Sequence, residues 1–233
     1  MKAAILSDIH ANRQALEAVL VACDAEKVDT FWLLGDYVDY GASALSVLDT
    51  LQLLNAEHVL CGNHDACLFH PDVRPSQTPH GYESYLHTME LMRQQPKKFE
   101  WLRNLTPIKT AWDDRVLLVH GTYDNPFWGK FSMTNASTDM MQKMASHMEN
   151  RNFEYMFMGH SHVSFSITIN GRTIVNPGSV GQPRNGIPLA QYAIFENGDI
   201  TFKRVSYDID AAAADIKKAG LPKSLWQRLH LGK

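Results

Sequence analysis

Six short polar clusters, rich in histidine, aspartate and asparagine, each follow an apolar run of the chain. They are Asp8-Ile9-His10, Gly35-Asp36, Gly62-Asn63-His64-Asp65, His120-Gly121, Gly159-His160-Ser161-His162 and Asn176-Pro177-Gly178-Ser179. Their donor groups are imidazole, carboxylate and amide oxygen, without thiolate, a set that suits Mn, Fe, Zn or Ni better than a structural zinc site built on cysteine. Brought together, these side chains would form a metal centre.

Each cluster taken alone also has an ordinary structural explanation. Asp8 stands just before a helical stripe, where aspartate commonly caps a helix. Gly35-Asp36 and Gly62-Asn63 are typical turn sequences, and a loop can carry His160 and His162 without any function. The metal-site interpretation therefore depends on the fold bringing the clusters to one place.

The first 65 residues predict alternating strands and helices. Strands are predicted over residues 3–6, 31–34 and 58–60, and helices over residues 12–27 and 44–55. The helices are indicated by apolar residues that recur on one face at helical spacing. This order favours a parallel sheet with right-handed crossovers, and ligands collect at the carboxyl ends of such strands. The polar clusters stand at those ends.

The second half of the chain is mostly strand-like. Strands are predicted over residues 115–119 and 155–158, with hairpins over 163–175 and 189–205 that turn at Asn170-Gly171 and Asn197-Gly198. A helix predicted over 134–150 carries four methionines, which indicate core packing rather than a cofactor site. The tail from Asp210 is predicted to be helical, with a break near Gly220 to Pro222.

Residues 66–105 differ from the rest of the chain. The segment begins irregularly and continues into two predicted helices, the second from Pro96 to Leu105. We find no repeat, low-complexity tract or linker, so we expect one domain over residues 1–233. Residues 66–105 would be a partly helical insertion near the site, forming a lid or wall that sets specificity.

Taken in order, the clusters from Asp8-x-His10 to Gly159-His160-x-His162 resemble the motifs of the calcineurin-like metallophosphoesterase superfamily, in its small bacterial phosphodiesterase branch. The resemblance runs from Ser7 to Arg184, over three quarters of the chain. It implies an α/β fold, a four-layer αββα sandwich of two mixed sheets with helices outside. The metals would lie in loops at one edge of the sheets.

The resemblance also implies two divalent metal ions, with Mn expected and Fe, Zn or Ni as alternatives. The implied ligands are Asp8, His10 and His162 for the first metal, Asn63, His120 and His160 for the second, and Asp36 for both. A bridging carboxylate would offer one oxygen to each cation and offset their repulsion. Two metals about 3.5 to 4 Å apart clamp phosphate oxygens and acidify a shared water, whose hydroxide would attack phosphorus in line.

Catalytic roles beside the metals follow from the same resemblance. His64 is placed to protonate the leaving oxygen, and Asp65 is expected to orient it. Asp39 is a further candidate for support near the ligands. Many superfamily members carry an arginine directly after the position of Asp39, where this chain has Tyr40. Substrate preference therefore does not transfer from those members.

Three residues are candidates for substrate binding. The loop after Asn176 would place Arg184 near the site, where a guanidinium can grip a nonbridging phosphate oxygen. A surface loop with an ordinary arginine is an equal alternative. Asn12 and Arg13 stand one turn beyond His10 and are further candidates, against the simpler interpretation of a solvated helix start.

Composition excludes several classes of function. The formal net charge is −3, which argues against nucleic acid or an anionic membrane as a partner through bulk charge. Three cysteines without a CxxC pair indicate a reducing compartment, and no apolar run has the length of a signal peptide core or a membrane span. We expect a cytoplasmic protein with no membrane partner. A homo-oligomer is left open.

The leading functional prediction is a dimetal-dependent phosphoesterase that hydrolyses phosphodiester bonds of a small substrate such as a nucleotide. A phosphomonoesterase, including a phosphoprotein phosphatase, is the alternative because the same metal core serves both reactions. A non-catalytic metal-binding scaffold is a third hypothesis from a different class. Metal-dependent turnover of a generic diester separates the scaffold from the two enzymes.

Overall fold

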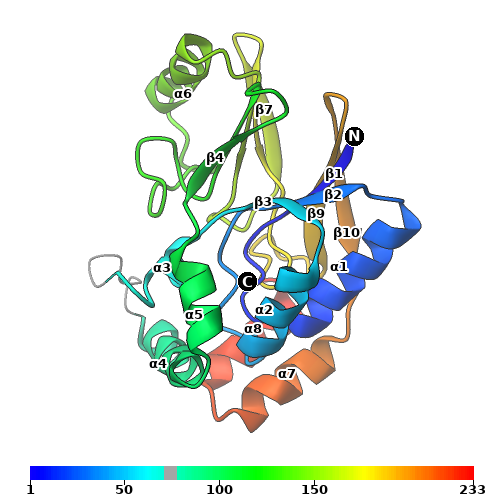
Figure 1. The fold of residues 1–233 in the computed structure, drawn as a ribbon, viewed down its shortest axis with the longest axis vertical. Coiled ribbons are helices and arrows are strands. Elements are labelled where there is room, and N and C mark those ends of the chain that lie inside the picture. Colours follow the sequence, from blue (N-terminus) through cyan, green and yellow to red (C-terminus); the bar gives the residue numbers. More distant parts are fainter. Residues whose placement is uncertain (71–77) are drawn as a thin grey trace.

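Two five-stranded sheets face each other in the computed structural model, which describes residues 1–70 and 78–233 (Figure 1). The first has the order β10 (Asp199–Val205), β9 (Ala190–Glu196), β1 (Lys2–Leu6), β2 (Thr30–Leu33), β3 (Ala56–Val59). The second has the order β4 (Ile108–Ala111), β5 (Val116–Val119), β6 (Tyr155–Met158), β8 (Arg172–Asn176), β7 (Phe165–Ile169). Both sheets are mixed, with parallel pairs β1–β2, β2–β3, β5–β6 and β6–β8.

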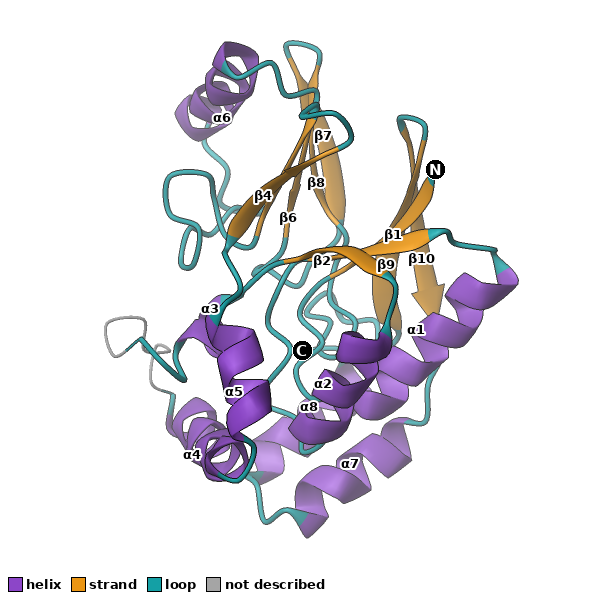
Figure 2. Ribbon diagram, viewed as in Figure 1, coloured by secondary structure: helices purple, strands orange, loops and turns teal. Residues whose placement is uncertain are grey.

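Helices cover the outer faces of both sheets (Figure 2). The helices are α1 (Arg13–Ala25), α2 (Ala44–Leu53), α3 (Asn63–Ala66), α4 (Pro79–Arg93), α5 (Pro96–Arg103), α6 (Thr138–Asn150), α7 (Ile209–Lys218) and α8 (Lys223–Leu231). Residues of α1 and α2 share one core with the outer face of the first sheet, and α6 packs through Met144 and Met148 on the second sheet. The layers are therefore α, β, β and α, which confirms the predicted fold class.

Strands β1, β5 and β6 are almost continuously apolar because side chains on both of their faces are buried. In β1, Ala3 and Ile5 face the core between the sheets, whereas Ala4 and Leu6 face the helices. The core between the sheets also contains Trp32 and Phe157, both fully buried. Strands that are covered on both faces need apolar residues at every position.

The predicted elements agree with the observed ones within a few residues. The exceptions are β4 and the single turn α3, which the sequence did not indicate. In the insertion, α5 begins with Pro96 as predicted, whereas Pro79, which was expected in the irregular stretch, begins α4. The irregular stretch predicted around Pro71 and Pro75 lies outside the described residues. Within the described ranges, no helix is long and apolar enough to cross a membrane.

We predict that Phe157→Ala lowers the free energy of unfolding by about 3–5 kcal/mol, because it leaves a cavity between the two sheets. Urea unfolding monitored by circular dichroism measures the change. Phe202→Ala is the matched control, since this phenylalanine is 40% exposed and its loss should cost far less. Equal losses for the two variants would contradict the assigned core.

Candidate metal centre

The polar clusters meet at the carboxyl ends of the parallel strands of both sheets. Asp8 follows β1, Asp36 follows β2, Asn63 follows β3, and His120 and His160 follow β5 and β6. Backbone hydrogen bonds join these loops to each other. The Asp8 N–H donates to the Gly35 carbonyl at 3.0 Å, and the Gly159 N–H donates to the His120 carbonyl at 2.9 Å. Residues far apart in sequence are thus fixed around one point.

Many residues of these loops have left-handed backbone conformations although they are not glycine. They are Asp8, His10, Ala11, Asp36, Asp39, Tyr40, His160 and His162, with φ between 47° and 65°. Each such residue costs of order 1–3 kcal/mol and persists only where the surroundings hold it, most often at functional sites. The loops therefore store strain in the residues that carry the candidate ligands.

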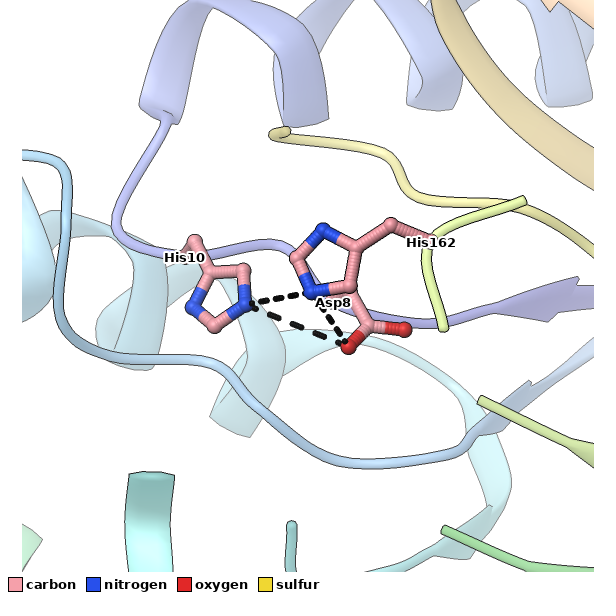
Figure 3. A group of neighbouring side chains, drawn as sticks. All are labelled: Asp8, His10 and His162. Atoms are coloured by element: carbon pink, nitrogen blue, oxygen red, sulfur yellow. Dashed lines mark hydrogen bonds and ion pairs between the residues drawn. The ribbon is translucent and has the colours of Figure 1, made fainter. Parts of the chain in front are cut away.

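Asp8, His10 and His162 form the first group of candidate ligands (Figure 3). The Nε2 atoms of His10 and His162 lie 3.2 Å apart, and His162 Nε2 lies 3.2 Å from Asp8 Oδ1. His10 Nε2 is 3.9 Å from the same carboxylate oxygen. All three side chains are buried.

Asp36, His120 and His160 form the second group, together with the side-chain amide of Asn63. His120 Nε2 lies 3.3 Å from Asp36 Oδ2 and 3.0 Å from Asn63 Oδ1. His160 Nδ1 lies 2.9 Å from the same amide oxygen. The structure therefore brings together all seven residues predicted as metal ligands, in the two groups that the resemblance implies.

Backbone carbonyls fix the tautomers of three of these histidines. Nδ1 of His10 donates to the Val38 carbonyl at 2.9 Å, Nδ1 of His120 to the Leu34 carbonyl at 2.8 Å, and Nδ1 of His162 to the Gln182 carbonyl at 2.6 Å. Because a carbonyl only accepts, each of these nitrogens carries a hydrogen, and a neutral ring then presents a lone pair at Nε2. Such second partners are typical of metal-binding histidines.

Each of the two carboxylates keeps one oxygen for the site. Asp8 Oδ2 accepts from the Ser7 hydroxyl and the His160 N–H, while Asp36 Oδ1 accepts from the His64 N–H. Asp8 Oδ1 and Asp36 Oδ2 are buried and receive no hydrogen bond. Buried oxygens facing imidazole lone pairs need a cation, so the residues present fit divalent metals.

The geometry at Asp36 differs from the expectation that its two oxygens serve one cation each. Oδ2 alone faces both groups, at 3.3 Å from His120 Nε2 and 3.7 Å from His10 Nε2. Oδ1 is held by the backbone of His64. Asp36 is still the residue shared by both groups, but it is shared through a single oxygen.

The protonation states of most groups suit metal binding. Burial lowers the pKa of His10, and burial together with the charge of His120 lowers the pKa of His160 to about 3. For Asp36, burial opposes ionisation, but His120 and His64 outweigh it and hold the pKa well below its usual range. His120 is different, because Asp36 outweighs burial and raises the pKa of this imidazole to about 9. A metal would displace that proton.

His64 lies beside both groups and pairs with Asp39. Its Nδ1 is 2.9 Å from Asp39 Oδ2, which leaves Nε2 for a substrate. Burial opposes a charged ring, but attraction to Tyr40 and Asp36, with the hydrogen bond to Asp39, outweighs it and raises the pKa of His64 to about 10. An imidazole held in its protonated form can give up a proton to a leaving group.

The predicted partner of His64, Asp65, has another role. Both oxygens of Asp65 accept backbone N–H groups, from Asp36 at 2.8 Å, Gly62 at 2.9 Å and Tyr37 at 2.9 Å. His64 and Asp65 are neighbours in α3, and adjacent residues of a helix do not face each other. Asp39 therefore orients His64, whereas Asp65 joins the loops after β2 and β3.

Two of the predicted substrate residues lie elsewhere. Asn12 caps α1, since its Oδ1 accepts from the Ala15 N–H and its Nδ2 donates to the Gly181 carbonyl. Arg13 pairs with Glu17 one turn along the helix and with Asp215 of α7. Both side chains are used by the helix start and its packing, so the structure does not bring them to the site.

A cavity of about 270 Å³ opens over the candidate metal ligands. Arg184 lines it, as predicted, together with Tyr40 and His64. Trp128 and Lys130 line it too, and sequence reasoning missed both because they belong to no motif and to no helix or strand. Their only sequence signal is that they follow the ligand His120 within ten residues.

The described part of the insertion lies outside the lining of this cavity. Residues 78–105 do not contribute to its lining, whereas α4 supports Tyr40 from outside, with the Tyr40 N–H donating to the Ser84 hydroxyl at 2.5 Å. A lid role for residues 66–105 stays a prediction.

Comparisons with known proteins agree with this fold and this site. Residues 1–199 match the family model of the calcineurin-like phosphoesterase superfamily domain. An uncharacterized protein of Methanocaldococcus jannaschii, MJ0912, is 30% identical over 99% of this chain and 98% of its own length. A metallophosphoesterase from Sphaerobacter thermophilus is 32% identical with a TM-score of 0.81, and each chain is covered completely.

A hypothetical protein from Pyrococcus horikoshii, PH1004, shares the fold with a TM-score of 0.85 at 20% identity, over 100% of this chain and 98% of the other. The two sheets and the clustered histidines and carboxylates define a metal-binding α/β phosphoesterase domain. The chain belongs to the calcineurin-like phosphoesterase superfamily. The resemblance seen in the sequence is confirmed, and membership supports a metal-dependent phosphoester hydrolase.

We predict that Asp36→Asn lowers the affinity for both metals and abolishes metal-dependent turnover, because a neutral amide cannot offset the repulsion between two dications. Metal content after dialysis, measured by elemental analysis, checks the first effect. Asp199→Asn is the matched control, an exposed aspartate at the first position of β10, and should keep two metals. Loss of only one metal would contradict a shared role for Asp36.

Proposed function

We propose that this protein is a dimetal-dependent phosphodiesterase that acts on a small phosphoester, with a nucleotide as the favoured substrate class. The observation that carries the proposal is the convergence of unpaired carboxylate oxygens and imidazole lone pairs on one point beside a cavity. Divalent ions bound there would neutralise phosphate oxygens and acidify a water molecule. Mn is the expected metal, with Fe, Zn or Ni as alternatives.

The roles of the surrounding residues follow from their contacts. His64 holds a proton at Nε2 toward the cavity while Asp39 fixes its ring through Nδ1. Arg184 lines the cavity, where its guanidinium can form charge-assisted hydrogen bonds with a nonbridging phosphate oxygen. Lys130 and Trp128 line the same cavity. The three cysteines are free and buried, and the cytoplasm stays the predicted compartment.

The shape of the cavity favours a diester. Tyr40, His64 and Arg184 line it beside the first ligand group, and Trp128 lies with its ring 6.1 Å from His160 of the second. Aromatic side chains near both ligand groups suit a phosphorus atom with a substituent on each side. The alternative of a monoesterase has one observation in its favour, because two cations, Arg184 and Lys130, would also suit a dianion.

We predict that the enzyme turns over bis-p-nitrophenyl phosphate with a higher kcat/KM than p-nitrophenyl phosphate. The two esters share a leaving group, so the comparison isolates the charge and shape around phosphorus. Steady-state kinetics with the same metal and pH decide between the alternatives. A clear preference for the monoester would favour the phosphatase, and no metal-dependent turnover of either would favour the scaffold.

We also predict that His64→Ala keeps two metals but slows hydrolysis by about 10²- to 10⁴-fold for alkyl leaving groups, since these need a proton. Nitrophenyl esters should lose much less because nitrophenolate leaves without one. Kinetics on matched alkyl and nitrophenyl diesters measure the difference, with the exposed His230→Ala as control. Equal losses on both esters would show that His64 does not act as an acid.

A further inference from the structure

Two arginines from distant parts of the chain lie against the same tyrosine beside the metal centre. The guanidinium carbon of Arg184 lies 6.0 Å from the centre of the Tyr40 ring, and that of Arg228, in α8, lies 5.5 Å from it. The Tyr40 ring in turn lies 4.7 Å from the ring of His10 and 4.7 Å from that of His64. Both cations are therefore one aromatic ring away from the candidate ligands.

The position of Arg184 is tied to a metal ligand. Gln182 accepts the Nδ1 hydrogen of His162 with its backbone carbonyl and a hydrogen bond from Arg184 Nη2 with its side-chain Oε1, at 3.0 Å. Gln182 thus fixes the tautomer of His162 and also holds the guanidinium of Arg184 in place. Arg184 Nε is buried without a hydrogen-bond partner, so this guanidinium has capacity left for a ligand.

The position of Arg228 is fixed by the end of the chain. Helix α8 buries Leu225 and Leu229 against α7, and the Gly186 N–H donates to the Gly232 carbonyl at 2.9 Å. That hydrogen bond joins the segment after α8 to the loop that follows Arg184. The Nε of Arg228 donates to the Lys233 carbonyl at 2.6 Å.

The side chains of these two arginines donate hydrogen bonds to the Gln182 side chain and the Lys233 main-chain oxygen, neither of which is a carboxylate side chain. No aspartate or glutamate side chain forms an ion pair with either guanidinium within residues 1–70 and 78–233. Burial and the nearby charge of Arg184 together lower the pKa of Arg228 to about 10. Two like charges held close together and partly buried are costly unless an anion joins them.

We propose that Arg184 and Arg228, which both lie against the ring of Tyr40, form an anion subsite that binds a second phosphoryl group of the substrate. The proposal rests on the proposed function, because the first phosphoryl group is the one at the metal centre. Two guanidiniums match the two charges of a terminal phosphoryl group better than the single charge of a carboxylate, and their planar forks suit its oxygens. The substrate class is thus narrowed to phosphoesters that carry a diphosphate.

Calorimetric titration of the Mn-loaded protein with methylphosphonate and methylenediphosphonate tests the subsite without requiring turnover. The native protein should bind the diphosphonate at least tenfold more tightly. Arg228→Met keeps an apolar side chain over Tyr40 but removes the charge, and should weaken diphosphonate binding about tenfold while changing methylphosphonate binding less than twofold. Arg228→Lys should keep part of the preference.

Lys223→Met is the matched control, an exposed cation of the same helix, and should change neither affinity. Equal weakening of both ligands by Arg228→Met, or no preference in the native protein, would overturn the subsite. Diphosphonate affinity that is unchanged in Arg228→Met would show that Arg228 only packs on Tyr40, and this result would also overturn the subsite. A preference for the diphosphonate in a protein that hydrolyses neither nitrophenyl ester would overturn the proposed function and leave the subsite standing.

Discussion

Mutual repulsion among buried lone pairs is the constraint on which the rest of the structure depends. Asp8 Oδ1 and Asp36 Oδ2 are buried without hydrogen bonds and face the Nε2 atoms of His10 and His162 at 3.2 to 3.9 Å. A protein interior does not hold such a group of acceptors together for its own stability. The loops must therefore be held by other interactions until cations balance the charge.

Those interactions come mainly from the backbone. The two sheets end their parallel strands at the same edge, and hydrogen bonds such as that from the His10 N–H to the Asp36 carbonyl join neighbouring loops. Asp65 adds three bonds to backbone amides and so connects the loops after β2 and β3. This network offsets the cost of the left-handed residues, and it places the ligands before any metal arrives. Preorganisation of this kind is what a catalytic centre requires.

The sequence predicted the parts of this arrangement that depend on strand ends. An apolar run covered on both faces must stop where the chain leaves the sheet, so the first polar residues after β1, β2, β5 and β6 mark the site directly. The sequence could not assign side-chain directions inside a turn. His64 and Asp65 are adjacent in sequence, yet the helical turn α3 directs their side chains apart. His64 therefore pairs with Asp39 instead.

Residues outside the motifs could not be predicted for a related reason. Trp128 and Lys130 reach the cavity, and Arg228 reaches Tyr40 beside it, through the path of the chain in space, which neither periodicity nor turn chemistry encodes. Asn12 and Arg13 were misplaced by the opposite error, since closeness to His10 in sequence suggested closeness to the substrate. A helix that starts at Arg13 turns its side chain toward Glu17, where an i,i+4 ion pair forms.

The proposed anion subsite draws in part on a different region of the chain from the candidate metal centre. The seven candidate ligands and His64 all lie within residues 1–199, the range that matches the superfamily, whereas Arg228 lies beyond it in α8. Within the candidate metal centre, His10, His120 and His162 each also donate to a backbone carbonyl, so their positions depend on the main chain around them. A terminal helix held by a few leucines and one backbone hydrogen bond is far less constrained. Changes in such a helix can alter which phosphoester is bound while the metal centre stays as it is.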